Sequence, residues 1–290
     1  TPYWEDGAGS SSLETGMNRT SSDRLAQAET LFAMLRPQDY PKAAFNDAWN
    51  NVLLYSEHTW GAWCSVGEPE RKETKEQWAI KRGYATQAAQ QSEALLAQAI
   101  GGKSLNEPVF DVFNTLSWTR TDLVMLSPEL AAMGTSVVDD AGKPVPSQKL
   151  ASGEMAFLAT KVPAFGSRRY RMANGSPSIS RPATVNGAIL DNGIVRVRLD
   201  EITGGIAALT LHGLTGNFAD TTNGETLNDY RYLIGDDLAN LQRNGPVKLR
   251  IGEKGPLVAS LIVESEAPGC HKLQREIRIV AGMDHVEIIN

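Results

Sequence analysis

The 290-residue sequence contains only two cysteines, Cys64 and Cys270, and they lie far apart in the chain. They provide neither a disulfide framework nor the paired spacing of a zinc site, so cysteine usage leaves the redox compartment open. No apolar run approaches the roughly 20 residues that a membrane-spanning helix needs. We therefore expect a soluble protein without a membrane partner, and its compartment stays open among periplasm, exterior and cytoplasm.

Basic residues are also in the minority, with 28 Lys and Arg against 34 Asp and Glu and a formal net charge of −6. A nucleic-acid partner would require a basic face to hold phosphates, so none is expected. The first residues, TPYWEDGAGS, lack the basic and apolar regions of a signal peptide. We expect the chain to begin and end inside a longer polypeptide; the alternative is an unusual but complete protein.

Residues 1–102 show helical periodicity. One helix begins near the serines at 10–12 and ends before Pro37, a second runs from Pro41 to about Tyr55, and a third begins near Pro69 and stops at Gly101. Three long amphipathic helices with short connections predict an antiparallel bundle. The residues expected on its buried faces are Leu13, Met17, Leu25, Ala28, Leu31, Phe32 and Leu35 in the first helix and Phe45, Ala48, Trp49, Val52, Leu53 and Tyr55 in the second.

The period changes from helix to strand after residue 102. Short alternating runs at 103–174, with a hairpin around 140–142, predict a small β-sandwich. A stretch rich in Gly, Ser and Pro at 175–186 predicts a linker, and residues 187–290 form a second β region. Because no helices alternate with these strands, the sheets should be antiparallel and the fold class α+β multidomain.

His58 lies in YSEHTWGAW, directly after the second predicted helix. A lone histidine at a helix end is more often a structural residue than a ligand, since zinc needs three or four ligands. The other histidines lie in the β regions without ligand spacing: His212, His271 and His285. From the residues alone, a structural role for His58 is favoured.

Trp4, in YWEDG, admits two interpretations that the residues leave equally open. An indole beside carboxylates suits a sugar, whose C–H face stacks on the ring while the carboxylates accept from its hydroxyls. The same pattern suits a hydrophobic staple before the first helix. The sequence contains no Gly-rich phosphate loop, nucleophile elbow or assembled Ser-His-Asp set.

Five segments taken in order resemble the α-mannosidases of glycoside hydrolase family 38. They are YWEDGAGSSSLETGMNR, DAWNNVLLYSEHTWGAW, VFNTLSWTRTDLVML, VPAFGSRRYRM and LDNGIVRVRLDEITGGIAAL. Each motif alone is of moderate specificity, and the resemblance covers essentially the whole chain. It implies a three-helix bundle, a β-sandwich and part of a galactose-mutarotase-like supersandwich, with the family's N-terminal β/α barrel preceding Thr1.

The resemblance also implies a zinc-dependent retaining hydrolysis of α-mannosides in glycans. The barrel would supply the nucleophile, the acid/base and most zinc ligands, so this chain alone should be inactive and carry no catalytic residue. His58 matches a zinc ligand, Trp4 a tryptophan near the bound sugar, and Tyr230, in LNDYRYLI, a tyrosine that reaches the site. Animal members read His-His-Asp at the position of His58, whereas Glu57 and Thr59 flank it here, which leaves Glu57 as the carboxylate for substrate contact or for orienting the site.

A second hypothesis belongs to another class: the chain is a non-catalytic carbohydrate-binding or interaction fragment. An upstream His-x-Asp motif with two barrel aspartates would favour the enzyme.

Overall fold

A computed structural model describes residues 11–57, 64–65, 67–101, 108–177, 179–234 and 237–290 of the chain. These residues form two compact units. One holds the three long helices together with the short segments Thr115–Trp118 and Ala164–Gly166, and the other holds nearly all of the β structure and a short helix. Within the described ranges, no helix is both long enough and apolar enough to cross a bilayer.

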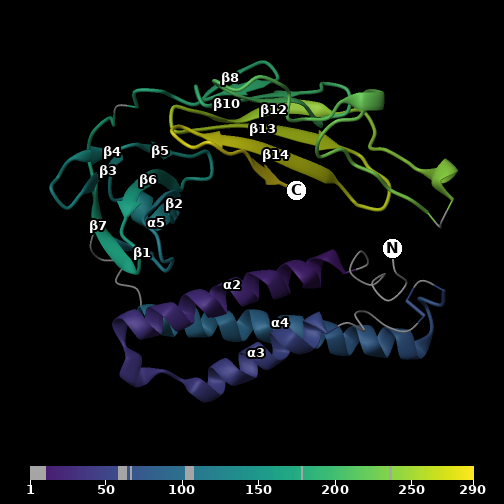
Figure 1. Cartoon of the computed structure of the whole chain (residues 1–290), viewed down its shortest axis with the longest axis horizontal. Coiled ribbons are helices and arrows are strands. Elements are labelled where there is room, and N and C mark those ends of the chain that lie inside the picture. Colours follow the sequence, from purple (N-terminus) through teal and green to yellow (C-terminus); the bar gives the residue numbers. More distant parts are fainter. Residues whose placement is uncertain (1–10, 58–63, 66, 102–107, 178, 235–236) are drawn as a thin grey trace. The chain divides into compact units, whose positions relative to one another are not determined.

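The helical unit is a bundle of α2 (Ser12–Leu35), α3 (Lys42–Ser56) and α4 (Lys72–Ile100) (Figure 1). Phe32 packs edge-on against Phe45, with ring centroids 5.7 Å apart, whereas Asn18 bonds to Ser56, so α2 and α3 run antiparallel. Lys81 and Gln91 of α4 contact Leu54 and Asn51 of α3, which makes that pair antiparallel as well. Gly101 ends α4 in the left-handed conformation at φ 83° and caps it through Ala97 O and Gln98 O. The predicted bundle is confirmed.

The buried faces of the bundle differ from the expected ones near its Ser12 end. Leu13 is 71% exposed and Leu53 is 62% exposed, while Glu14 and Asn18 are buried. The expectation for Leu13 and Leu53 was therefore wrong, and so was that for Leu35 at the other end of α2, which is 44% exposed. Polar contacts replace apolar packing at the Ser12 end, where α2 meets the last turn of α3, and the apolar core lies further along, around Leu25, Phe32 and Phe45.

The β unit begins with two small sheets. One has the strand order β1 (Val109–Asn114), β7 (Gly166–Ala173), β3 (Ser136–Asp139), β4 (Pro144–Val145), and the other β2 (Arg120–Leu126), β6 (Met155–Val162), β5 (Ser147–Lys149); a short helix, α5 (Pro128–Ala131), follows β2. The predicted hairpin around 140–142 is confirmed, because Val137 of β3 pairs with Val145 of β4. A core of Met155, Phe157, Tyr170 and their neighbours lies within this sandwich.

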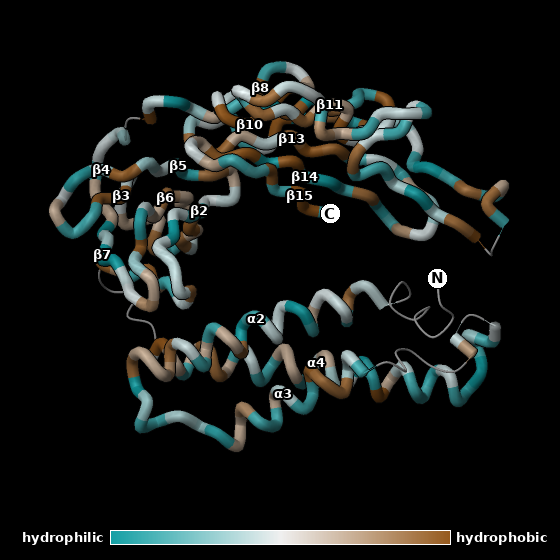
Figure 2. The backbone as a smooth tube through the Cα atoms, viewed as in Figure 1, coloured by the Kyte–Doolittle hydropathy of each residue, from teal (hydrophilic) through white to brown (hydrophobic). Residues whose placement is uncertain are grey.

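Two four-stranded sheets complete the β unit. Their orders are β11 (Ile206–Leu211), β10 (Val195–Leu199), β9 (Ile189–Asp191), β8 (Thr184–Asn186) and β12 (Lys248–Lys254), β13 (Val258–Ser265), β14 (Leu273–Val280), β15 (Glu287–Ile289). Apolar residues are concentrated along β13 and β14, where the larger core lies (Figure 2). The predicted fold class, α+β with antiparallel sheets, is confirmed.

The β6 strand joins the two cores of the β unit. Met155, Phe157 and Ala159 face the core of the small sandwich, whereas Ala156 and Leu158 face the larger core with β13 and β14. β8 lies within the stretch expected to be a linker. The domain boundaries at 102, 174 and 186 stay predictions.

Candidate functional site

The end of α3, from which the predicted site segment continues, is held by a lysine of α4. Lys81 Nζ lies 2.5 Å from Glu57 Oε1 and donates to the Leu54 carbonyl at 3.0 Å. The Lys81 side chain is only 16% exposed. A cation at this position neutralises Glu57 and the negative end of the helix dipole, and it satisfies a carbonyl that has no partner inside the helix.

Polar residues of α2 hold the same helix end from the other side. Asn18 Nδ2 donates to Ser56 Oγ at 2.7 Å and to the Val52 carbonyl at 3.4 Å. Thr15 Oγ1 lies 3.0 Å from the Tyr55 hydroxyl. Asn18 Oδ1 is buried, and no group in the described part of the chain donates to it. The last turn of α3 is thus fixed against both neighbouring helices.

Two of the predicted site residues, Trp4 and His58, lie outside the described residues. Glu57 is described, and its carboxylate binds Lys81. Lys81 and Asn18 were missed by sequence reasoning, because a lysine and an asparagine within amphipathic helices give no local signal of what they contact. The sequence feature that could have indicated Lys81 is its opposite charge to Glu57, and this pairs the two residues only when the two helices pack together.

Zinc is implied by the resemblance. Among the described residues, no group of three or more His, Cys, Asp and Glu side chains is arranged to hold a metal. The ligand role of His58 therefore stays a prediction.

Tyr230, the predicted substrate contact in the β unit, lies in the long segment between β11 and β12. Its hydroxyl donates to the Pro268 carbonyl at 2.5 Å. Burial, followed by a hydrogen bond with Cys270, raises the pKa of the Tyr230 phenol. The residue after Pro268, Gly269, has a φ of 78° and packs against a different tyrosine, since a Cβ there would come within 2.2 Å of the Tyr232 ring. Because the Tyr230 phenol donates its proton to the Pro268 carbonyl, its oxygen can act toward a ligand only as a hydrogen-bond acceptor.

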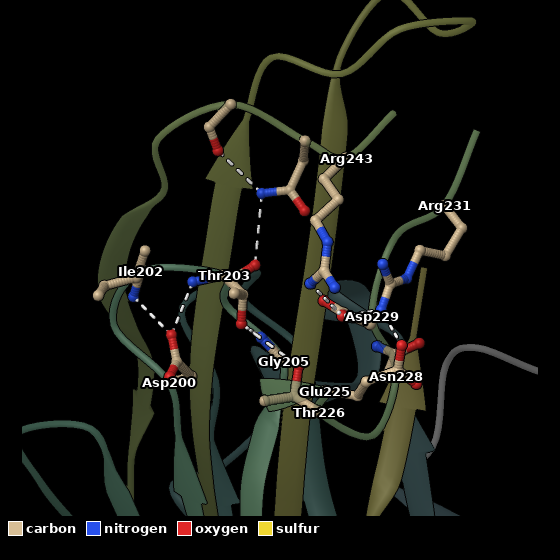
Figure 3. A network of polar contacts seen from close by, with 12 residues as sticks. Asp200, Ile202, Thr203, Gly205, Glu225, Thr226, Asn228, Asp229, Arg231 and Arg243 are labelled. Atoms are coloured by element: carbon tan, nitrogen blue, oxygen red, sulfur yellow. Dashed lines mark hydrogen bonds and ion pairs between the residues drawn. The ribbon is translucent and has the colours of Figure 1, made fainter. Parts of the chain in front are cut away.

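Asp229, next to Tyr230, is the centre of a network of ion pairs (Figure 3). Arg231 Nη2 and Arg243 Nη1 both contact Asp229 Oδ2, at 3.0 and 2.9 Å. Arg231 Nη2 also contacts Glu225 Oε1 at 2.9 Å. The Asp229 side chain is only 8% exposed, so these contacts compensate for the desolvation of its charge.

Arg275 anchors the backbone on either side of this network. The residue is 2% exposed, and its guanidinium donates to the Thr203 carbonyl at 2.7 Å and the Asn228 carbonyl at 3.1 Å. Burial lowers the Arg275 pKa, while the nearby Asp229 charge raises it. Gly204, at φ 74°, is required here because a Cβ would come within 2.5 Å of Arg275 Nη2.

Comparison with known proteins gives matches among solved structures. No family model and no curated protein sequence matches this chain. An α-mannosidase from Enterococcus faecalis V583 matches with a TM-score of 0.56 at 13% identity, over 94% of this chain and 40% of that chain. A glycosyl hydrolase family 38 protein from Enterococcus faecalis matches with a TM-score of 0.54 at 12% identity, over 94% of this chain and 42% of that chain.

Over the matched residues, the chain shares the fold of a part of these glycoside hydrolase structures. It spans about 40% of the length of the first of these structures. At 13% identity this similarity establishes the fold, and one fold is compatible with many activities.

Proposed function

We propose that this chain is the helical and adjoining β part of a glycoside hydrolase whose whole protein removes terminal α-mannose from glycans. The observation that carries the proposal is the match of 94% of the chain to α-mannosidase structures. The ordered sequence motifs support it independently, because a fold alone is compatible with many activities.

Within this proposal the reaction is a retaining hydrolysis by two carboxylates. Both carboxylates belong to a barrel outside this chain, so the 290-residue chain alone has no nucleophile and no acid/base. His58 is the zinc ligand that this part contributes, and zinc, when bound, polarises the mannose hydroxyls. Trp4 and Tyr230 contact the sugar, the first by stacking and the second through its phenol oxygen.

Glu57 has a distinct place in the proposed site. Its carboxylate is neutralised by Lys81 at 2.5 Å. A carboxylate in such a pair is a weaker acceptor for a sugar hydroxyl than a free one. Orientation of the segment that follows α3 is therefore the role of Glu57 that the contacts favour, with sugar contact as the second role.

The competing function is a non-catalytic carbohydrate-binding or interaction fragment. The two hypotheses differ in what the rest of the gene encodes. A His-x-Asp motif and two carboxylates in an upstream barrel support the enzyme, and their absence supports the fragment.

The decisive experiment compares the whole protein with the 290-residue chain on an aryl α-mannoside. We expect the whole protein to release the phenol, with retention of the anomeric configuration in the first-formed sugar, and the chain alone to remain at the buffer rate. A whole protein that is folded and zinc-replete but inactive on α-mannosides would contradict the proposal, as would turnover by the chain alone.

A further inference from the structure

A pocket in the β unit lies beside the Asp229 network. Its volume is about 470 Å³, and it is lined by the turn at 201–203, Asp229 and the segment 243–247. This size is within the range of small-ligand sites. The lining offers both apolar and charged groups to a small ligand. Ile202, Pro246 and Val247 are apolar, while Glu201, Asp229 and Arg243 are charged.

The walls of this pocket are fixed before any ligand arrives. Asp200 Oδ1 accepts from the amides of Ile202 and Thr203, each at 2.8 Å, which holds the turn. Asn244 Nδ2 donates to the Thr203 carbonyl at 3.3 Å and so joins the two walls. A preorganised pocket loses little entropy when it binds, which matters most for a weakly bound small molecule.

Asp229 presents an acceptor to this pocket. Arg231 and Arg243 both contact its Oδ2, and none of the described residues makes a hydrogen bond to its Oδ1. The lone pairs of Asp229 Oδ1 are therefore available to a donor from a ligand or from water. Arg243 is 41% exposed and uses only Nη1 in the pair, so its other nitrogens can donate. A donor and an acceptor therefore lie side by side.

We propose that this pocket binds a neutral sugar. Glu201 and Asp229 disfavour an anion, and Arg231, Arg243 and the buried Arg275 disfavour a cation. A hydroxyl both donates and accepts, so vicinal hydroxyls match Arg243 next to Asp229 Oδ1, with Glu201 as a further acceptor. The C–H face of a pyranose matches the apolar surface of Ile202, Pro246 and Val247. The inference concerns the 290-residue chain itself and does not depend on the proposed hydrolysis.

The test is a titration of the 290-residue chain followed by amide NMR shifts. The probes are methyl α-mannopyranoside, mannose 6-phosphate as an anion and mannosamine as a cation. We expect saturable shifts at 201–203 and 243–247 with the neutral probe and weaker binding of both charged sugars. Arg243→Gln should weaken binding at least about tenfold, because a charged donor is lost. The control Arg196→Gln removes an exposed arginine of β10 outside the pocket and should bind normally.

Glu201→Ala provides a second variant if Arg243→Gln is unfolded in its thermal melt. It removes an exposed acceptor and should weaken binding at least about threefold. No saturable shift with the neutral probe, shifts outside the pocket, tighter binding of a charged probe, or unchanged binding in the folded variants would each overturn the inference. A whole protein without mannosidase activity would leave it standing, and a failed titration would leave the proposed hydrolysis standing.

Discussion

Lys81 is the residue on which the end of α3 depends most. It is a mostly buried cation with two partners, the Glu57 carboxylate and the Leu54 carbonyl. Lys81→Met would remove the ammonium group that pairs with the partly buried Glu57 carboxylate and donates to the Leu54 carbonyl at the helix end. We expect a loss of about 1–3 kcal/mol in the free energy of unfolding, measured by urea denaturation of the 290-residue chain.

The matched control is Lys75→Met on the same helix. Lys75 also pairs with a glutamate, Glu70, but its side chain is 53% exposed and that of Glu70 is 86% exposed. Exposed pairs contribute little, so this variant should change stability by no more than about 0.5 kcal/mol. Equal losses in the two variants would show that the burial of Lys81 has no energetic consequence.

Asp200 makes the stability of the β unit depend on pH. The Thr203 and Ile202 amides donate to its carboxylate, and these bonds, with Thr203 first, lower the Asp200 pKa. A folded pKa below the unfolded one, about 3.9, adds stability above the unfolded pKa. This stability is lost as the pH falls through the folded pKa. Asp200→Asn should therefore lose less stability than the parent on acidification below about pH 5.

Urea midpoints measured across this acidic range check the Asp200 prediction. The control is Asp284→Asn, since the Asp284 side chain is 84% exposed. Its midpoints should follow those of the parent chain. Parallel acid profiles for Asp200→Asn and the parent would contradict the assigned cause.

At the scale of elements, Gln148 of β5 connects the two β cores. Its Oε1 accepts from the amides of Leu257 and Val258 at 2.8 and 2.9 Å, and its Nε2 donates to the Val258 carbonyl at 3.2 Å. Gln148→Ala removes three partners of backbone groups near the start of β13. The expected loss is about 2–4 kcal/mol in urea denaturation, with the exposed Gln274→Ala of β14 as a control that changes little. A loss no larger than that of Gln274→Ala would contradict this role.

Sequence periodicity predicted the element types but could not predict which faces are buried at their ends. Leu13 and Leu53 follow the apolar period of their helices, yet the buried contacts there belong to Glu14, Asn18 and Lys81. A period registers where apolar residues recur. It does not register pairs such as Lys81 with Glu57, which only the packing of two helices brings together.

A similar limit applies to β6, which is buried on both faces. Its run MAFLA shows no polar alternation, and such a run does not reveal which neighbour each face meets. The structure separates the run into Met155, Phe157 and Ala159 toward one core and Ala156 and Leu158 toward the other. Because one strand contributes side chains to both cores, the two β regions form one compact unit.

At the scale of the whole molecule, the fold was predictable because it rests on long periodic elements and ordered motifs. The Asp229 network was not, since Asp229, Arg243 and Arg275 are brought together from separate segments. Arg275 donates to carbonyls 47 and 72 residues away in sequence, and the residues of β14 around it give no indication of these partners. A site assembled from residues far apart in sequence can be predicted only when the fold that brings them together is known.

The role of His58 can be tested in the whole protein. If His58 is a ligand to zinc, His58→Ala should lower zinc affinity by more than the 10- to 100-fold typical of losing a residue that only supports a ligand. Zinc content after dialysis against a chelator of graded strength measures this without reliance on activity. His271→Ala, at an exposed position of the β unit, is the control and should keep its zinc. Because one imidazole holds zinc weakly, the 290-residue chain should retain none under conditions in which the whole protein stays loaded. Full zinc occupancy in His58→Ala would return His58 to a structural role at the end of α3.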